Sequence, residues 1–348
     1  MKESPMITDE KNTSRGYRSN RVRGSSAALF DRRGFRVALA TCRELPELDR
    51  ESRRLASALE RLGVRAVPAV WDDPSVVWQG FDLVVVRSCW DYIYRREEFL
   101  QWADQIPRIK NPAEVCRWNS DKRYLAELQR QGIPVVPTNW IEPDKTWLPP
   151  TTGEWVMKPA VSICAVGAGR YDLADPTHRG QASQHFQRLK HTFQTTMLQP
   201  YLTGVDREGE TALVYFGERF SHAVRKPAIL SGPDNGQDRR FQHLGGINPV
   251  PVTATREQLA IGERVLSLVP GGVSSLLYAR VDLVPGENGE PLLLELEVIE
   301  PNLFLMFTET GLDALTAQIE ACIVTDHDAP RGGNGLFQPN RQTLLKRQ

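Results

Sequence analysis

The sequence predicts an α/β protein whose N-terminal part holds a parallel sheet and whose C-terminal part is α+β, with an antiparallel sheet. Two observations carry this prediction. Between residues 35 and 86, short apolar runs alternate with a helical pattern, as in a parallel sheet covered by helices. After residue 198, apolar runs come in pairs separated by short turn sequences, as in antiparallel hairpins.

Composition narrows the class of partner. The chain has 348 residues, enough for two or three domains, and Lys plus Arg equals Asp plus Glu at 43 each. A balanced charge does not attract nucleic acid or an anionic membrane. The five cysteines include no Cys-x-x-Cys, and no segment approaches about 20 apolar residues. We therefore expect a cytoplasmic monomer or homodimer that acts on a small molecule, with no nucleic acid or membrane partner.

The pattern divides the chain into five segments. Residues 1–34 are polar and rich in arginine, which favours a disordered extension over a basic arm for nucleic acid. The expected segments are this extension, an N-terminal α/β domain over 35–113, a small central domain over 114–197, a C-terminal antiparallel-sheet domain over 198–325, and a tail over 326–348.

The N-terminal domain begins with an apolar strand at 35–41 and a helix at 49–62 that Gly63 ends. Further strands follow at 64–70 and 81–86. In open α/β sheets, ligands bind at the carboxyl ends of the strands. The polar residues after the last strand are therefore candidate substrate contacts, with an ion pair that caps the loop as the alternative; they are Arg87, Ser88 and Asp91.

Two lysines mark the central domain. Lys122 is expected in the first turn of a helix that Asn119 or Ser120 caps, where a cation opposes the helix dipole unless an anion lies nearby. Lys158 ends a strand with an apolar face, and a lysine there is seldom buried without a counter-anion. An exposed lysine is the alternative for Lys122. A helix is expected at 183–195, capped by Ser183.

The loop at 160–170 follows the Lys158 strand and is built of small residues. Such a loop suits phosphates bound through backbone N–H groups, although an ordinary hairpin loop explains it equally well.

A first hairpin is expected over 209–226, and its last residues, Arg225 and Lys226, can hold an anion or form a solvated strand end. A second hairpin is expected over 278–302, around a type I′ turn at Asn288-Gly289.

The second hairpin predicts a charged face. If Asn288 and Gly289 are its two loop residues, Asp282 faces Glu295 and Arg280 faces Glu297, all on one side. The other side then carries apolar residues: Ala279, Val281, Leu283, Leu294, Leu296 and Val298. Facing acids destabilise a sheet, so a divalent cation would explain Asp282 opposite Glu295. A cross-strand ion pair between Arg280 and Glu297 is the alternative role for Glu297.

The order of these features resembles the ATP-grasp superfamily over most of residues 36–323. The resemblance implies ATP and Mg²⁺, with Mn²⁺ as the alternative cation. It assigns Lys122 and Lys158 to the nucleotide phosphates, and Arg280 to the transferring phosphoryl group and the tetrahedral intermediate. The remaining assignments are Gln199, Pro200, Tyr201 and Leu202 to adenine; Asp282, Glu295, Glu297 and Asn302 to the metal; Arg87, Ser88, Asp91 and Lys226 to the substrate; and Arg225 to catalysis.

One departure concerns the third metal ligand. The superfamily has Glu-x-Asn on the second strand, whereas this chain has Glu295-Leu-Glu297 and then Glu300-Pro-Asn302. Either Glu297 or Asn302 is therefore expected as that ligand. This run, with residues 87–92, resembles the branch that includes the cyclo-ligase of cycloserine biosynthesis, which closes O-ureido-D-serine into a ring.

The resemblance implies an ATP-dependent carboxylate–amine ligase of antibiotic biosynthesis, which forms an amide through an acyl phosphate and releases ADP and phosphate. Ring closure is one form of that reaction. Two alternatives are a protein that binds nucleotide without catalysis and a ligase that adds amino acids to a peptide or protein.

Overall fold

The computed structural model describes residues 34–192, 194–234, 248–308 and 310–328, which belong to one compact unit that begins at residue 33. The expected extension at 1–34, apart from Gly34, and the expected tail after 328 lie outside the described residues. Within the described ranges, no helix has both the length and the apolar character needed to cross a membrane.

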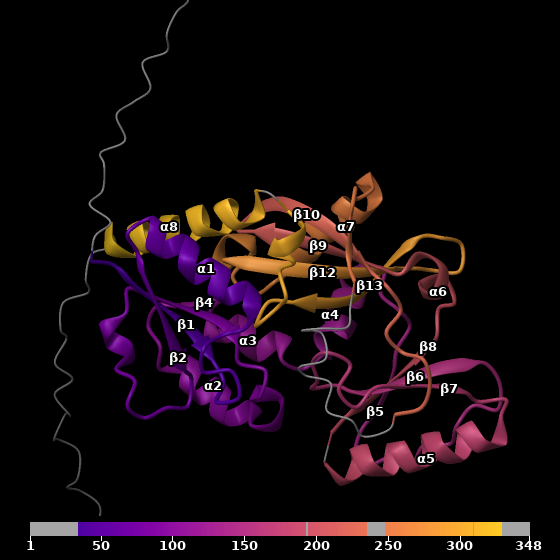
Figure 1. The fold of residues 1–348 in the computed structure, drawn as a ribbon. Coiled ribbons are helices and arrows are strands. Elements are labelled where there is room, and N and C mark those ends of the chain that lie inside the picture. The colour runs from indigo at the N-terminus through magenta and orange to yellow at the C-terminus, as the bar shows by residue number, and fades with distance from the viewer. Residues whose placement is uncertain (1–33, 193, 235–247, 309, 329–348) are drawn as a thin grey trace, which may run out of the picture. The chain divides into compact units, whose positions relative to one another are not determined.

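The N-terminal sheet is parallel, as predicted, with strand order β2-β1-β3-β4 (Figure 1). Its inner strands β1 and β3 are buried, as expected where helices cover a parallel sheet, whereas the edge strand β2 is mostly half-buried or exposed. Asp49 caps the helix α1 by accepting from the backbone N–H groups of Glu51 and Ser52. The elements are β1 (Arg36–Thr41), α1 (Arg50–Arg61), β2 (Arg65–Val70), β3 (Leu83–Ser88), α2 (Arg96–Asp104), β4 (Ile109–Lys110), α3 (Ala113–Asn119) and α4 (Tyr124–Arg130).

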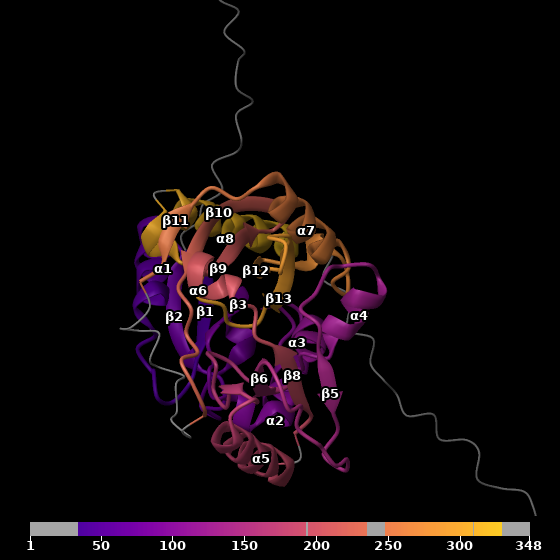
Figure 2. The same ribbon diagram turned by 90° about the vertical axis from the view of Figure 1, so that its right-hand side faces the viewer.

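The central sheet is antiparallel, with order β5-β8-β6-β7, and α5 packs on one of its faces (Figures 1 and 2). The helix predicted at 183–195 is wrong at its start, because α5 begins at Pro176. Asp175 caps it by accepting from Thr177 N–H, and Ser183 lies inside the helix. The elements are β5 (Asn139–Ile141), β6 (Glu154–Pro159), β7 (Gly169–Asp172), α5 (Pro176–His191), β8 (Thr196–Pro200) and α6 (Gly204–Glu208).

The C-terminal sheet is antiparallel, with order β11-β10-β9-β12-β13. Leu315, Ile319 and Ile323 of α8 pack in a cluster that also holds Leu55 and Leu59 of α1, so these two helices lie side by side (Figure 1). The elements are β9 (Glu210–Phe216), β10 (Arg219–Lys226), β11 (Val250–Val252), α7 (Arg256–Ser267), β12 (Tyr278–Pro285), β13 (Pro291–Glu297) and α8 (Gly311–Asp328), with short 3₁₀ turns at Trp78–Gly80, Tyr92–Tyr94, Val273–Ser275 and Leu305–Phe307.

The β12–β13 hairpin confirms the predicted pairs but not the predicted turn. Asp282 faces Glu295 and Arg280 faces Glu297. The loop, however, spans residues 286–290, and a bulge follows Asp282. The longer loop shifts the pairing of the strands by one residue, and the extra residue of the bulge, Leu294, shifts it back. The predicted register is therefore restored at Asp282 and Glu295.

The bulge also changes which leucine is buried. Leu293 is fully buried in the core cluster, whereas Leu294, which was predicted to face the core, is partly exposed. The prediction for Leu294 is wrong because an extra residue in one strand reverses the alternation of faces beyond it.

Gly209, just before β9, provides a test of this sheet. Its φ of 72° and ψ of −166° are open essentially only to glycine, and a Cβ there would lie 2.3 Å from the Lys226 carbonyl oxygen. We expect Gly209→Ala to lower the free energy of unfolding by about 1–3 kcal/mol in a denaturant titration. Gly180→Ala, inside α5 with no atom within 4 Å of the added Cβ, is the control and should raise it by about 0.4–1 kcal/mol. Equal free energies of unfolding for Gly209→Ala and wild type would contradict the expected strain of a Cβ at this position.

Candidate active site

Arg280 is the centre of a charged cluster on β12 and β13. Its Nε and Nη2 atoms donate to Asp282 at 2.9 and 2.8 Å, and Nη2 also contacts Glu297. Its Nη1 donates to the Asn302 carbonyl oxygen at 3.0 Å. Arg280 and Asp282 are both buried. The ion pair between Arg280 and Glu297, which the sequence left as an alternative, is therefore present.

Lys226 joins this cluster from β10. Its Nζ lies 2.7 Å from Asp282 Oδ2 and 2.9 Å from Oε2 of Glu210 on β9. Neighbouring side chains on a strand point to opposite faces, so Arg225, which is exposed, lies on the other side of β10. The structure thus brings Lys226 to the cluster and keeps Arg225 away from it.

The carboxylates of the cluster respond differently to the same burial. Burial raises the pKa of a carboxylate, but the charges of Arg280 and Lys226 outweigh it and hold the pKa of Asp282 at about 2. Burial raises the pKa of Glu297 to about 7, and the nearby Asp282 and Glu295 charges act in the same direction against Arg280. The two cations therefore keep the pKa of Asp282 low, whereas Glu297, which shares Arg280 with Asp282, has a raised pKa.

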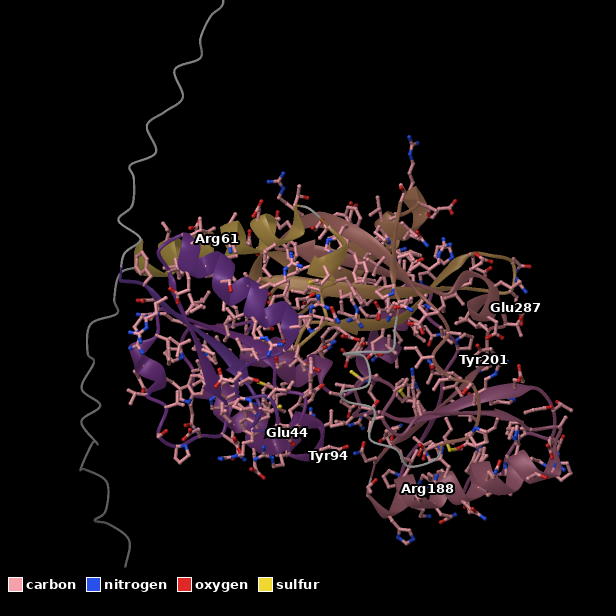
Figure 3. All side chains as sticks on the ribbon, in the orientation of Figure 1. Glu44, Arg61, Tyr94, Arg188, Tyr201 and Glu287 are labelled. Carbon is pink, nitrogen blue, oxygen red and sulfur yellow. The ribbon has the colours of Figure 1, made fainter. Side chains whose placement is uncertain are left out.

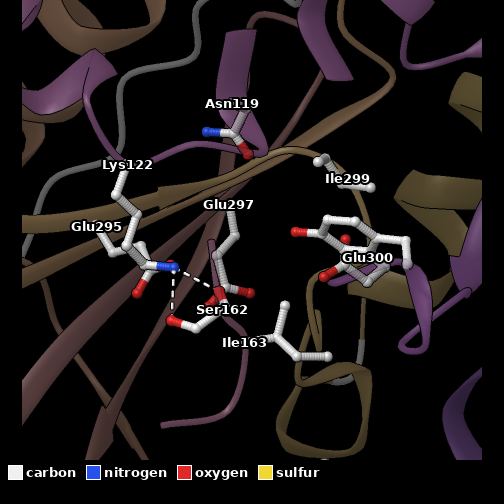
Figure 4. A pocket seen from close by; sticks show the side chains of 9 residues that line it. Asn119, Lys122, Ser162, Ile163, Glu295, Glu297, Ile299 and Glu300 are labelled. Carbon is white, nitrogen blue, oxygen red and sulfur yellow. Dashed lines mark hydrogen bonds and ion pairs between the residues drawn. The ribbon is translucent and has the colours of Figure 1, made fainter. Parts of the chain in front are cut away.

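Lys122 reaches the cluster from the opposite side. Its Nζ lies 3.0 Å from Glu295 Oε1, contacts the Ser162 carbonyl oxygen and is 3.4 Å from Ser162 Oγ (Figure 4). The prediction that Lys122 lies in a helix is wrong, because residues 120–123 form a turn between α3 and α4. Its backbone N–H donates to the Ala160 carbonyl oxygen, which holds this turn against the strand β6.

The predicted N-cap role of Asn119 and Ser120 is wrong as well. Asn119 is the last residue of α3, and its side chain bonds the β13 backbone at Leu296 and Val298. Ser120 follows it and accepts a hydrogen bond from Arg96.

Lys158 has no direct partner for its charge among the described residues. It lies at the end of β6, where burial lowers its pKa and the charges of Lys122 and Lys226 add to the effect against Glu295. No described residue makes a hydrogen bond or ion pair with its Nζ. A charge in that position favours any anion that can reach it.

A small polar pocket lies between Lys122 and β13 (Figure 4). Sequence reasoning missed several of its lining residues. Glu300, whose pKa burial and the Glu297 charge raise well above the usual value, belongs to the motif run at 294–301 and was therefore within reach of the sequence. The lining residues are Tyr92, Asn119, Lys122, Ser162, Ile163, Glu295, Glu297, Ile299 and Glu300.

The segment predicted to contact adenine, from Gln199 to Leu202, connects the central sheet with α6. Gln199 is buried and donates to Thr138 Oγ1 at 2.9 Å. Tyr201, which is labelled in Figure 3, donates its backbone N–H to the Glu154 carbonyl oxygen. The Arg170 guanidinium carbon lies 3.5 Å from the centre of the Tyr201 ring. Pro200 lies between Gln199 and Tyr201, and Leu202 follows Tyr201.

The three candidate substrate residues of the N-terminal sheet have protein partners. Arg87 Nη2 donates to Glu51 at 2.9 Å, and Ser88 Oγ donates to Asp49 at 2.6 Å. Asp91 accepts from Trp71 Nε1 at 2.8 Å and from Arg95. All three are buried. Among the buried polar atoms of these three side chains, Nη1 of Arg87 is the one that has no hydrogen-bond partner in the described part of the chain.

The proposed metal ligands are carboxylate and amide oxygens, the donors that a hard cation such as Mg²⁺ prefers. Asp282, Glu295 and Glu297 bond cations of the protein as they stand, and the Asn302 side chain accepts from Phe304 N–H at 2.9 Å. Within the described ranges, no three acidic, thiol or imidazole side chains enclose a common point.

Comparison with known proteins gives one consistent family. A model of the N-terminal domain of D-cycloserine synthetase DcsG matches residues 37–117. The cycloserine biosynthesis protein DcsG of Streptomyces lavendulae is 34% identical over 299 residues, which cover 79% of this chain and 94% of that protein.

Solved structures agree with this relationship. The crystal structure of D-cycloserine synthetase DcsG matches with a TM-score of 0.73 and 31% identity, over 83% of this chain and 99% of that one. The D-alanine–D-alanine ligase of Bacillus anthracis, complexed with ATP, matches with a TM-score of 0.60 and 12% identity, over 84% and 99%, and so shows the fold alone. The chain belongs to the family of D-cycloserine synthetase DcsG and has the fold of the ATP-grasp ligases.

Proposed function

We propose that the chain binds ATP and Mg²⁺ beside the charged cluster and uses them to join the carboxylate and amine of a small, amino-acid-like substrate. The observation that carries the proposal is Lys158, whose Nζ makes no hydrogen bond or ion pair with any described residue, although it lies within range of the charges of Lys122 and Glu295. The phosphates of a nucleoside triphosphate would supply negative charge beside the Lys158 ammonium group.

Asp282, Glu295 and either Glu297 or Asn302 would hold the Mg²⁺. The pairing of β12 with β13 gathers Asp282, Glu295 and Glu297 on one face, which supports this assignment, and a bound cation would lower the pKa of Glu297 that burial and the acidic neighbours raise. When bound, the ion neutralises charge on the phosphates. When ATP binds, the Lys122 ammonium group would leave Glu295 and bind a phosphate oxygen, because the carboxylate and the phosphate compete for it.

The residues of the chain then act by alignment and charge. A substrate carboxylate oxygen attacks the γ-phosphorus, the bond to ADP breaks, and an acyl phosphate forms. An amine attacks the acyl carbon, phosphate leaves, and the amine loses its proton. Such steps need positioning and charge stabilisation more than a protein nucleophile. Arg280 would stabilise the oxyanion of the second step, with Lys122 and Lys158 on the phosphates.

The finer substrate assignment is ring closure on a substrate like O-ureido-D-serine. It is supported by the activity for which the relatives are named, D-cycloserine synthetase. Arg87 would donate from its Nη1 atom to the substrate carboxylate. Ser88, Asp91 and Lys226 are the other proposed substrate residues. Arg225, the second proposed catalytic residue, is exposed on the other side of β10. We also propose residues 35–113, 114–197 and 198–325 as the three domains of the ligase.

The test measures ADP release with Mg²⁺ across a panel of amino acids that includes O-ureido-D-serine. Lys158→Ala is expected to raise the KM for ATP about 10–100-fold, because hydrogen bonds to charged groups contribute about 1.5–3 kcal/mol each. Glu295→Gln is expected to raise the Mg²⁺ requirement. Lys145→Ala removes an exposed lysine that pairs with Asp144, and this control should behave as wild type.

Turnover that is unchanged in both site variants would rule out the site assignment. Binding of ATP without ADP release would favour the non-catalytic alternative, and mass added to a polypeptide would favour the peptide ligase.

A further inference from the structure

Glu51, on α1 of the N-terminal part, contacts the segment that carries Asn302. Its Oε1 accepts from the Leu303 backbone N–H at 2.8 Å, and its Oε2 accepts from the Leu305 backbone N–H at 2.8 Å. The same Oε1 accepts from Arg87 Nη2 at 2.9 Å. Glu51 and Arg87 are both buried.

The segment between these two amides has a conformation that requires support. Phe304 has a φ of 54° and a ψ of 33°, the left-handed region that bulky residues rarely adopt. His222 Nε2 donates to the Leu303 carbonyl oxygen at 2.9 Å on the other side. Glu51 is thus one of the groups that hold the chain in this strained turn.

The turn at residues 302–305 also contacts Arg280. The Asn302 carbonyl oxygen accepts from Arg280 Nη1 at 3.0 Å, and the Phe304 ring lies 5.4 Å from the Arg280 guanidinium carbon. The carboxylate of Glu51 therefore holds the backbone amides of Leu303 and Leu305. Asn302 and Phe304, which lie before and between them, contact one side of the Arg280 guanidinium.

We propose that Glu51 is a positioning residue, which holds the 302–305 turn and through it orients Arg280 for catalysis without touching a reacting atom. The inference rests on the role proposed for Arg280. It gives the buried pair of Glu51 and Arg87 a function at a site that lies in another sheet.

The test is Glu51→Gln, an isosteric change that places an amide NH₂ against a donor. We expect kcat to fall about 10–100-fold, as for other residues that orient catalytic groups, with the KM for ATP little changed. Glu60→Gln, an exposed acid on the same helix, is the matched control and should retain wild-type kcat. A general loss of folding would lower kcat and nucleotide binding together and would lower the melting temperature of the ATP complex.

An Arg280→Lys background separates positioning from stability. There Glu51→Gln should add little further loss, because both changes act on one guanidinium. Full additivity, or an unchanged kcat in a folded Glu51→Gln enzyme, would overturn the inference. Should Glu51→Gln not fold, Glu51→Asp carries the same measurements, since it keeps the charge beside Arg87 but is too short for both amides. A wild-type enzyme that releases no ADP would overturn the role of Arg280 instead.

Discussion

Arg280→Lys is expected to lower kcat about 10²–10³-fold, the usual cost of removing one donor that stabilises an oxyanion. Lysine keeps the positive charge but lacks the planar fork. It cannot replace bonds that run from Nε and Nη2 to Asp282 and from Nη1 to the Asn302 carbonyl oxygen. The KM for ATP should change little, because the phosphates are assigned to Lys122 and Lys158.

Steady-state ADP release, measured at saturating ATP and Mg²⁺, checks this result. Arg264→Lys makes the same exchange at an exposed arginine that donates to the Gly132 carbonyl oxygen, and it should leave kcat unchanged. An Arg280→Lys enzyme with wild-type kcat would show that the guanidinium is only a structural partner of Asp282 and Glu297.

Asp282→Asn is expected to lower the free energy of unfolding by about 3–5 kcal/mol at neutral pH, the usual effect of removing one partner of a buried ion pair. The change leaves Arg280 and Lys226 with less negative charge in a buried cluster. Denaturant titration measures the loss. Asp104→Asn, which breaks an exposed pair with Arg117, should cost less than about 1 kcal/mol.

The same variant gives a signature in acid. The pKa of Asp282 is lowered from 3.8 to about 2 in the folded protein. Its contribution to stability is therefore complete above pH 3.8 and is lost as the pH falls toward 2. Wild type should lose more stability than Asp282→Asn across this window. Parallel acid titrations of the two proteins would contradict the assignment of the low pKa to Asp282.

Local patterns determined a large part of the site. Because side chains alternate along a strand, Arg280, Asp282, Glu295 and Glu297 had to share one face once the hairpin formed, and the structure confirms both pairs. The apolar runs before Arg87 likewise sufficed to predict a parallel sheet. The bulge after Asp282 was not visible, because no residue type there marks it.

Only the tertiary structure decided which charges meet. Lys226 lies 56 residues from Asp282 in sequence, and Glu51 lies 252 residues from Leu303, so neither contact follows from a local period. Lys122 lies outside its predicted helix, in a turn, and its backbone N–H donates to Ala160, the residue after β6. The sequence by itself determined the faces and the order of the charged residues, since these follow from backbone geometry over a few residues. Their partners depend on how separate sheets pack, and that packing is set by buried contacts between distant parts of the chain.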